Sequence, residues 1–228
     1  MFQMLYYAFT LRHRPMMGTL DTETVKRRLR FDYVRVKNEP GSRAVDGITS
    51  LMAHFHRQQL SINEVIQEAS DIIQRQFKLK WVMIGIKGKA DGLFRYTVMT
   101  GMNKDVWERQ RRRTYRAEDF DPSCATYRFG EISDLTRVYL QEENMLYSEE
   151  EKKLVQRPAL LFSKRVSSSE TLEADFIDTL MYGPGRTLLG WIEYSGTVAN
   201  EFPQPVVIRQ IEGYAAVLAA AVAVHLHS

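Results

Sequence analysis

The chain has 228 residues, a formal net charge of +3 at pH 7, 44% hydrophobic residues and 26% charged residues. This composition is typical of a folded, soluble protein, and we expect one domain of about 150 to 180 residues plus an extension. The single cysteine, Cys124, excludes an intramolecular disulfide and a cysteine-caged zinc site, and it favours a reducing, cytoplasmic location. No apolar run reaches the roughly 18 to 20 residues that span a bilayer, so we expect no membrane association.

Residues 1–44 are interpreted as an N-terminal extension that precedes a folded domain over residues 45–228. The first residues lack the basic leader and the cleavage site of a signal peptide, and Met16 or Met17 is an alternative start of translation. A basic run from Lys26 to Arg30 then precedes a possible short strand over residues 31–37. Flexible basic arms bind nucleic acid, so this run is a candidate nucleic-acid contact, although no helix-turn-helix or RNA-binding motif accompanies it.

Two helices are expected at the start of the domain. Apolar residues recur at helical spacing through residues 48–55 and again through residues 65–73. Ser61 and Glu64 match a capping box, which predicts a new helix directly after Ser61. We therefore place the break between the two helices near Leu60.

A strand pair follows the helices. Residues 81–87 are apolar on both faces, as in a central strand that is covered on two sides. Asp91 and Gly92 form a hairpin signal, and residues 93–100 supply the partner strand. From residue 102 to 173 the periodicity is poor, and we expect an irregular insertion with a charged helix around residues 148–156.

The last third of the chain predicts a second hairpin and a closing helix. Residues 175–182 and 187–195 are rich in apolar and aromatic residues, and the turn residues 183–186 between them favour a chain reversal. Pro203 and Pro205 fit the first turn of a helix that is apolar without a break from residue 214 to 224. Such a helix has neighbours on more than one side.

Strands joined in hairpins argue for an antiparallel sheet and against a doubly wound one. We predict an α+β fold with a central antiparallel sheet of about five to six strands and with the N- and C-terminal helices packed on one face.

The closing hairpin and helix resemble the GAF domain family, a relative of PAS sensor domains, over roughly residues 45–227. The resemblance is carried by the strand of residues 176–181, the turn of residues 183–186, the apolar strand around Gly190 and the Ala-rich helix over residues 211–224. A missing side chain at Gly190 would let a neighbouring element approach closely.

The resemblance implies a non-catalytic sensory or regulatory module that binds a small molecule or a protein. It also implies a homodimer through the helices of residues 45–77 and 206–227. Output would then come from a separate protein or from the N-terminal extension.

The same resemblance places a pocket between the central strands and the segment of residues 102–173. Aromatic residues of the sheet offer a stacking surface for a flat hydrophobic or heterocyclic ligand, with Arg128 or Asp178 as polar contacts. The sequence identifies no particular cofactor. The predicted ligand-binding residues are Trp81, Tyr96, Cys124, Tyr127, Arg128, Asp178 and Trp191.

Cys124 is the basis of one alternative function. Some GAF-like proteins reduce methionine sulfoxide with pocket cysteines, and nearby arginines would stabilise the thiolate of a redox sensor. Cysteines that attach bilins in this family are commonly followed by histidine, whereas Ala125 follows here.

A transcription-related regulator that uses the basic arm is the second alternative.

Other residue patterns carry weaker signals. Asn103 and Lys104 begin the dispersed signature of cyclic-nucleotide-binding relatives, but the rest is missing. The arginines of residues 109–116 fit an anion site or a solvated face. The histidines lack the spacing of metal ligands, and Ser167–Ser169 lacks the setting of a nucleophile, so we expect neither a metal nor an enzymatic activity.

Overall fold

The computed structural model describes residues 22–37, 42–58, 61–124, 127–144 and 148–227. The chain divides into two compact units, Met1–Glu39 and Pro40–Ser228. In the first unit, α1 spans Thr22–Lys37 and carries the exposed basic run Lys26 to Arg30. The strand expected over residues 31–37 is therefore wrong. A helix satisfies its backbone hydrogen bonds within itself, whereas a lone strand needs a partner.

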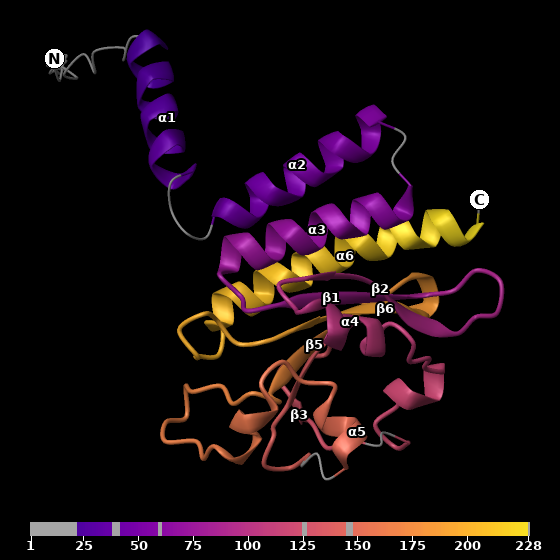
Figure 1. Ribbon diagram of the computed structural model, residues 1–228. Coiled ribbons are helices and arrows are strands. Elements are labelled where there is room, and N and C mark those ends of the chain that lie inside the picture. Colours follow the sequence, from indigo (N-terminus) through magenta and orange to yellow (C-terminus); the bar gives the residue numbers. More distant parts are fainter. Residues whose placement is uncertain (1–21, 38–41, 59–60, 125–126, 145–147, 228) are drawn as a thin grey trace, which may run out of the picture. The chain divides into compact units, whose positions relative to one another are not determined.

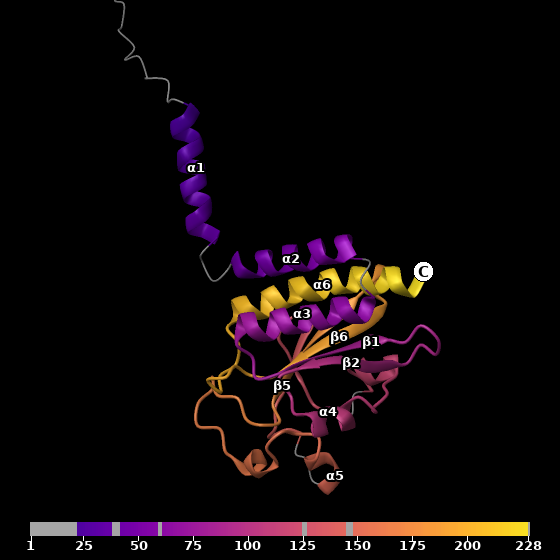
Figure 2. The same ribbon diagram turned by 45° about the horizontal axis from the view of Figure 1, so that its top comes forward.

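The second unit places helices on one face of a sheet and an irregular layer on the other (Figures 1 and 2). The helix α3 (Ile62–Phe77) packs on β1 and β2, and α6 (Pro205–His227) packs on β5 and β6. The helix α2 (Arg43–Gln58) packs on α3 and α6, so it forms an outer layer above the two helices that touch the sheet.

The capping box predicted at the start of α3 is present. The Ser61 side chain accepts a hydrogen bond from the Glu64 amide, and the Glu64 carboxylate accepts one from the Ser61 amide at 2.8 Å. Residue Leu60, where the break was expected, lies outside the described residues, but the two helices are separate elements.

The sheet has six strands in the order β2-β1-β6-β5-β4-β3, and every neighbouring pair is antiparallel. This confirms the predicted α+β class. Both predicted hairpins are present. The strands are β1 (Val82–Lys87), β2 (Phe94–Thr100), β3 (Gly130–Glu131), β4 (Thr136–Tyr139), β5 (Phe176–Tyr182) and β6 (Leu188–Tyr194).

The two hairpins join through β1 and β6, which are more than 100 residues apart in the chain and pair from Val82 with Tyr194 to Ile86 with Gly190. A Cβ atom on Gly190 would lie 2.3 Å from the carbonyl oxygen of Gly85. Only glycine therefore allows this close approach of the two hairpins, as the sequence predicted.

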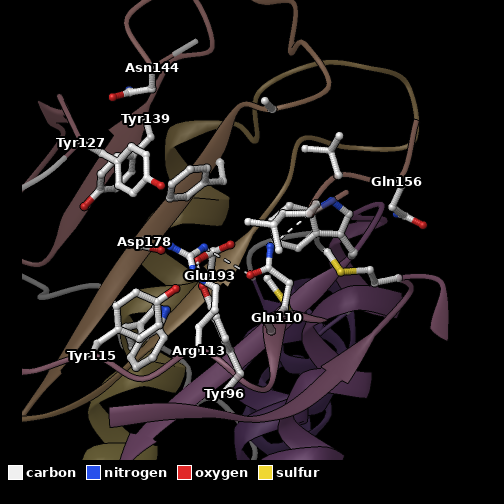
Figure 3. A pocket seen from close by; sticks show the side chains of 18 of the residues that line it. Tyr96, Gln110, Arg113, Tyr115, Tyr127, Tyr139, Asn144, Gln156, Asp178 and Glu193 are labelled. Carbon is white, nitrogen blue, oxygen red and sulfur yellow. Dashed lines mark hydrogen bonds between the residues drawn. The ribbon is translucent and has the colours of Figure 1, made fainter. Parts of the chain in front are cut away.

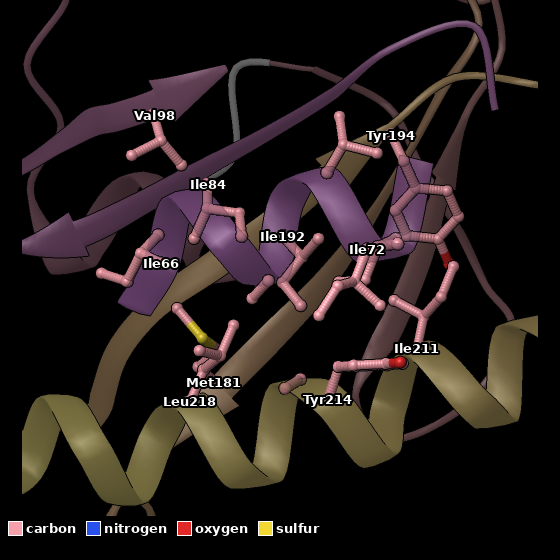
Figure 4. Close-up of a cluster of buried hydrophobic side chains, with 14 of the residues drawn as sticks. Ile66, Ile72, Ile84, Val98, Met181, Ile192, Tyr194, Ile211, Tyr214 and Leu218 are labelled. Carbon is pink, nitrogen blue, oxygen red and sulfur yellow. The ribbon is translucent and has the colours of Figure 1, made fainter. Parts of the chain in front are cut away.

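The main core lies between the sheet and the helices (Figure 4). Ile66 of α3 and Leu218 of α6 meet Ile84 of β1 and Ile192 of β6, and all four side chains are fully buried. Fully burying one such side chain contributes about 1.5 to 3 kcal/mol. The opposite face of the strands also carries buried residues, among them Met83, which confirms that the central strand is covered on both sides.

The closing helix α6 differs from one sequence expectation. It has 23 residues, and an 18-residue stretch of it has a mean hydropathy of 1.5, so by length and composition alone it could cross a membrane. In this fold it packs on the sheet and also contacts α2 and α3, and Ile211, Tyr214, Leu218 and Val222 are buried along it. Its apolar character therefore fits a core helix with neighbours on several sides, as predicted.

The segment of residues 102–173 contains short elements. These are α4 (Lys104–Gln110), the 3-10 helix η2 (Ala117–Phe120), β3, β4, α5 (Glu149–Lys152) and the 3-10 helix η3 (Pro158–Phe162). The helix expected over residues 148–156 is shorter than predicted, since the carbonyl groups of Lys153 and Leu154 accept hydrogen bonds from side chains of α4. These contacts replace the bonds of a further helical turn.

Candidate functional site

A cavity of about 130 Å³ lies on the face of the sheet opposite α3 and α6 (Figure 3). Strands β1, β2, β4, β5 and β6 contribute to its wall, as do α4, η2 and the loops around residues 102, 115, 127, 144, 155 and 173. Aromatic rings dominate this lining: Trp81, Tyr96, Tyr115, Phe120, Tyr127, Tyr139, Phe176 and Trp191.

Trp191 is the centre of the aromatic wall. It pairs with Gly85 across β6 and β1, and a Cβ atom on Gly85 would lie 2.1 Å from the indole ring. The missing side chain therefore makes room for the indole above β1. The Trp191 ring then contacts the rings of Tyr96, Tyr115 and Phe120, with centroid distances of 4.9, 5.5 and 5.0 Å.

Two buried carboxyl groups lie side by side on this wall. Asp178 of β5 pairs directly with Glu193 of β6, and their exposed fractions are 5% and 7%. The Tyr96 hydroxyl donates a hydrogen bond to Glu193 Oε2 at 2.6 Å. Asp178 Oδ1 is buried and accepts no hydrogen bond from the described residues. Buried carboxylate oxygens without a donor are uncommon in native proteins and call for an explanation.

Burial raises the pKa of Asp178 well above its ordinary value, and the neighbouring Glu193 raises it further, while Arg137 and the Tyr139 hydroxyl oppose the shift. Burial also raises the pKa of Glu193, against the hydrogen bond from Tyr96 and the charge of Arg113. Two adjacent carboxyl groups in a desolvated site resist simultaneous ionisation. The pair therefore holds a proton to higher pH than surface carboxyl groups do.

Two arginines lie close to the carboxyl pair without forming an ion pair with it. Arg113 lies over the Tyr115 ring, 5.1 Å from its centroid, and donates to Gln110 Oε1 at 3.4 Å. Arg137 pairs with Asp178 in the β4–β5 register, but its Nη1 donates to the Phe120 carbonyl at 2.6 Å. Among the described residues, no ion pair within 4 Å includes Asp178 or Glu193.

The rim of the cavity is held in place by Asp175. Its carboxylate accepts hydrogen bonds from the amides of Leu172 at 2.7 Å and Gln141 at 2.8 Å, and it forms an ion pair with Arg165 at 2.9 Å. The Gln141 side chain in turn accepts a hydrogen bond from the amide of Ala174, which lines the cavity. The rim is thus built by specific hydrogen bonds although it contains little regular structure.

Known structures share this fold. The GAF domain/HD domain protein from Geobacter sulfurreducens matches with a TM-score of 0.51 at 13% identity, covering 73% of this chain and 94% of that one. The chain has a GAF fold. The GAF domain of a phosphoenolpyruvate-protein phosphotransferase from Coxiella burnetii matches with a TM-score of 0.50 at 9% identity, covering 80% of this chain and 94% of that one. No protein-family model and no curated protein matches the sequence significantly.

The GAF fold confirms the resemblance carried by the closing hairpin. Identities this low establish the fold alone, so a function has to be argued from the residues of this chain.

The GAF cavity brings together Trp81, Tyr96, Tyr127, Asp178 and Trp191, all of which were predicted as ligand-binding residues. Their role in binding stays a prediction.

Cys124 and Arg128 were predicted with them, but both side chains are exposed and neither contributes to the cavity lining. Cys124 lies in a turn with its sulfur 3.6 Å from the Ser123 hydroxyl. The Arg128 amide donates to Asn144 Oδ1 at 2.7 Å.

Two lining residues of the GAF cavity were absent from the predicted ligand-binding set, although Arg113 belongs to the run that was considered as an anion site. Glu193 follows Trp191 by two residues, and alternation along a strand puts both on the same face, so its position was open to prediction. Arg113 is the member of the arginine run that lines the cavity. Its neighbours Arg109, Arg111, Arg112 and Arg116 are exposed, which fits a solvated face.

Other sequence signals have structural roles. Asn103 Oδ1 accepts a hydrogen bond from the Val106 amide at 3.0 Å, so Asn103 caps α4. Within the part of the chain that is described, no group of three or more His, Cys, Asp or Glu residues is arranged to hold a metal ion.

Proposed function

We propose that this GAF domain is a sensory or regulatory module that binds a small molecule in the cavity over β5 and β6 and transmits the binding event without catalysing a reaction. The observation that carries the proposal is Asp178, a buried carboxyl group with an oxygen that lacks a donor among the described residues, set in an aromatic wall. A ligand donor would offset the cost of burying that oxygen. Ligand pockets commonly combine an apolar lining with a few convergent polar groups of this kind.

A route from the cavity to α6 supports a signalling role. Thr179 follows Asp178 on β5 and faces the helices, and its hydroxyl is 3.1 Å from the Thr136 hydroxyl. Thr136 donates to Glu212 of α6 at 2.9 Å, and Ser133 donates to the same oxygen at 2.5 Å. A ligand that moves β5 against β4 would alter this network and shift the population of α6 positions.

A second copy of the chain is the proposed partner of the helical face. An apolar groove of about 530 Å³ runs between α2, α3 and α6, with a lining that is almost entirely apolar. Met52 and Val224 are exposed beside it. Burying such a surface drives association. The homodimer would thus use the helices of residues 45–77 and 206–227, and a separate output protein would read their packing.

Two residues outside the cavity bear on the alternatives. Exposed Cys124 does not line the cavity, which argues against a redox mechanism that uses a pocket thiol. The exposed basic side chains of α1 favour a separate nucleic-acid contact through Lys26 to Arg30. The cytoplasmic location stays a prediction from the cysteine content.

A thermal-shift screen of nucleotides, amino acids and tetrapyrroles tests the proposed ligand site. Ala174→Phe would fill the cavity without removing a side-chain hydrogen bond, and Ala199→Phe, in an exposed turn, is its matched control. We expect at least one ligand to stabilise the wild type and Ala199→Phe but not Ala174→Phe. Equal stabilisation of all three proteins would place the ligand elsewhere, and no stabilisation of any would argue for a dimerisation scaffold.

A further inference from the structure

The carboxyl pair on the cavity wall points to a particular class of ligand, and this inference rests on the proposed ligand-binding role of the cavity. We propose that the cavity selects small planar organic cations whose N–H groups donate hydrogen bonds to Asp178 and Glu193. Amidinium, guanidinium and protonated amino-heterocycles have this chemistry.

The first argument is the hydrogen-bonding state of the pair. Asp178 lines the cavity, and its buried Oδ1 has no donor among the described residues. Glu193 accepts from the Tyr96 hydroxyl, so that hydroxyl is engaged and does not serve Asp178. The strongest available partner for a buried carboxylate is a cationic N–H group.

The second argument is the spacing of the two carboxyl groups. Asp178 and Glu193 face each other on adjacent antiparallel strands, where the Cβ atoms of paired residues lie about 5 Å apart. A planar cation that carries N–H groups on two nitrogens presents donors in a fixed fork, which suits neighbouring carboxylate oxygens. A single ammonium would satisfy one carboxyl group more easily than both.

The third argument is charge. Four carboxyl groups line the cavity (Asp119, Glu173, Asp178 and Glu193) against one guanidinium, that of Arg113. Glu173 is neutralised by an ion pair with Arg157 at 2.8 Å, and Arg113 is engaged with Tyr115 and Gln110. Asp119, Asp178 and Glu193 form no ion pair among the described residues. The guanidinium of Arg137, beside Asp178, donates to the Phe120 carbonyl instead. The site therefore favours a cation over an anion such as a cyclic nucleotide.

The fourth argument is the shape and chemistry of the walls. The rings of Trp191, Tyr96 and Tyr115 contact one another and line the same cavity as the pair, and the faces of aromatic rings attract cations. The volume of about 130 Å³ is comparable with an apolar cavity of roughly 150 Å³ that holds benzene. The ligand is therefore the size of a single ring with its substituents.

Three probe molecules of the same shape but different charge test whether the cavity prefers a cation. Benzamidine is a planar cation with two N–H-bearing nitrogens, benzamide is its neutral counterpart and benzoate is the anion. With the full chain at pH 7.5, calorimetric titration should give a Kd for benzamidine at least about tenfold lower than for benzamide or benzoate. Asp178→Asn should weaken benzamidine binding by at least about tenfold, while Asp134→Asn, an exposed carboxyl control, should leave it unchanged.

Tighter binding of benzoate would overturn the inference and would mean that Arg113 turns toward an anionic ligand. Equal binding of all three probes, or benzamidine binding that survives Asp178→Asn, would also overturn it, although the cavity would remain a ligand site. If none of the probes binds, cation selectivity is rejected. The proposed function would still hold if the thermal-shift screen finds a ligand whose binding is abolished by Ala174→Phe.

Discussion

Asp178 of β5 and Glu193 of β6 lie directly opposite each other in the sheet, and both side chains are buried. Like charges opposite each other on adjacent strands destabilise a sheet, and burial adds a desolvation cost. A sheet that served only as a scaffold would be more stable with apolar residues at these two positions. The proposed role in ligand binding accounts for a pair that costs the sheet stability.

Asp178→Asn should stabilise the protein at neutral pH. Folding raises the pKa of Asp178, so the folded protein is more stable when this side chain is protonated. Below the ordinary carboxyl pKa that stability is fully present. It is lost as the pH rises through the raised pKa. Asparagine does not ionise. We expect a gain of roughly 1 to 2 kcal/mol at pH 8 that disappears toward pH 4 in urea unfolding.

The neighbouring groups of Asp178 act on its pKa in opposite directions. Glu193 adds to the raised pKa, whereas Arg137 and the Tyr139 hydroxyl favour the carboxylate. If Asp178→Asn instead destabilised the protein at pH 8 more than at pH 4, Asp178 would be ionised and paired with Arg137 in solution.

Gly85→Ala should displace the Trp191 ring. A Cβ atom at this position would lie 2.1 Å from the indole, and the indole is packed among three other rings. We expect a loss of about 1 to 3 kcal/mol and a changed near-ultraviolet circular dichroism spectrum. Gly130→Ala is the control, because its nearest contact, Val138, is 3.3 Å away at an exposed edge, and its effect should stay within about 0.5 kcal/mol.

The network between β4 and α6 should appear in a double-mutant cycle. Thr136→Val and Glu212→Gln each remove part of the hydrogen-bonded chain that joins Thr179 to α6. Each single change should cost about 0.5 to 1.5 kcal/mol, and their effects in urea unfolding should be non-additive by at least about 0.5 kcal/mol. Additive effects would mean that the two residues are not coupled and that this route does not carry the signal.

Ala220→Glu should disrupt the proposed homodimer. Ala220 lines the apolar groove and is exposed in the isolated chain, so a carboxylate there would have to be desolvated when a second copy binds. Sedimentation velocity should find a dimer for the wild type and for Ala199→Glu, an exposed change away from the groove, and a monomer for Ala220→Glu. A wild-type monomer, or an unchanged dimer in the variant, would contradict the proposed interface.

Local chemistry explains which parts of this fold the sequence predicts. The capping box of Ser61 and Glu64 and the turn between β5 and β6 depend on nearby residues, and both are present. The strand β4 was missed because it has four residues, too few for a periodicity, and its pairing with β5 involves residues about 40 positions away. The helix α1 was missed in part because aromatic and β-branched residues at 31–36 also fit a strand.

The cavity was only partly predictable for a related reason. Strand residues such as Tyr96, Asp178 and Trp191 follow the alternation of a sheet, so their face can be inferred once the strands are known. The rim depends on contacts such as the ion pair of Asp175 with Arg165, and no local sequence pattern predicts such a contact. Cys124 was placed in the pocket by family resemblance alone, and the turn that holds it leaves it exposed.

The central claim is that a small molecule occupies the cavity and is held by Asp178. Native mass spectrometry of the full-length protein purified from its own host tests it most directly, with Asp178→Asn and Cys124→Ser purified in parallel. We predict an additional small-molecule mass on the wild type and on Cys124→Ser that is reduced or lost on Asp178→Asn. No bound mass on any protein, or a mass retained by Asp178→Asn and lost from Cys124→Ser, would contradict the account.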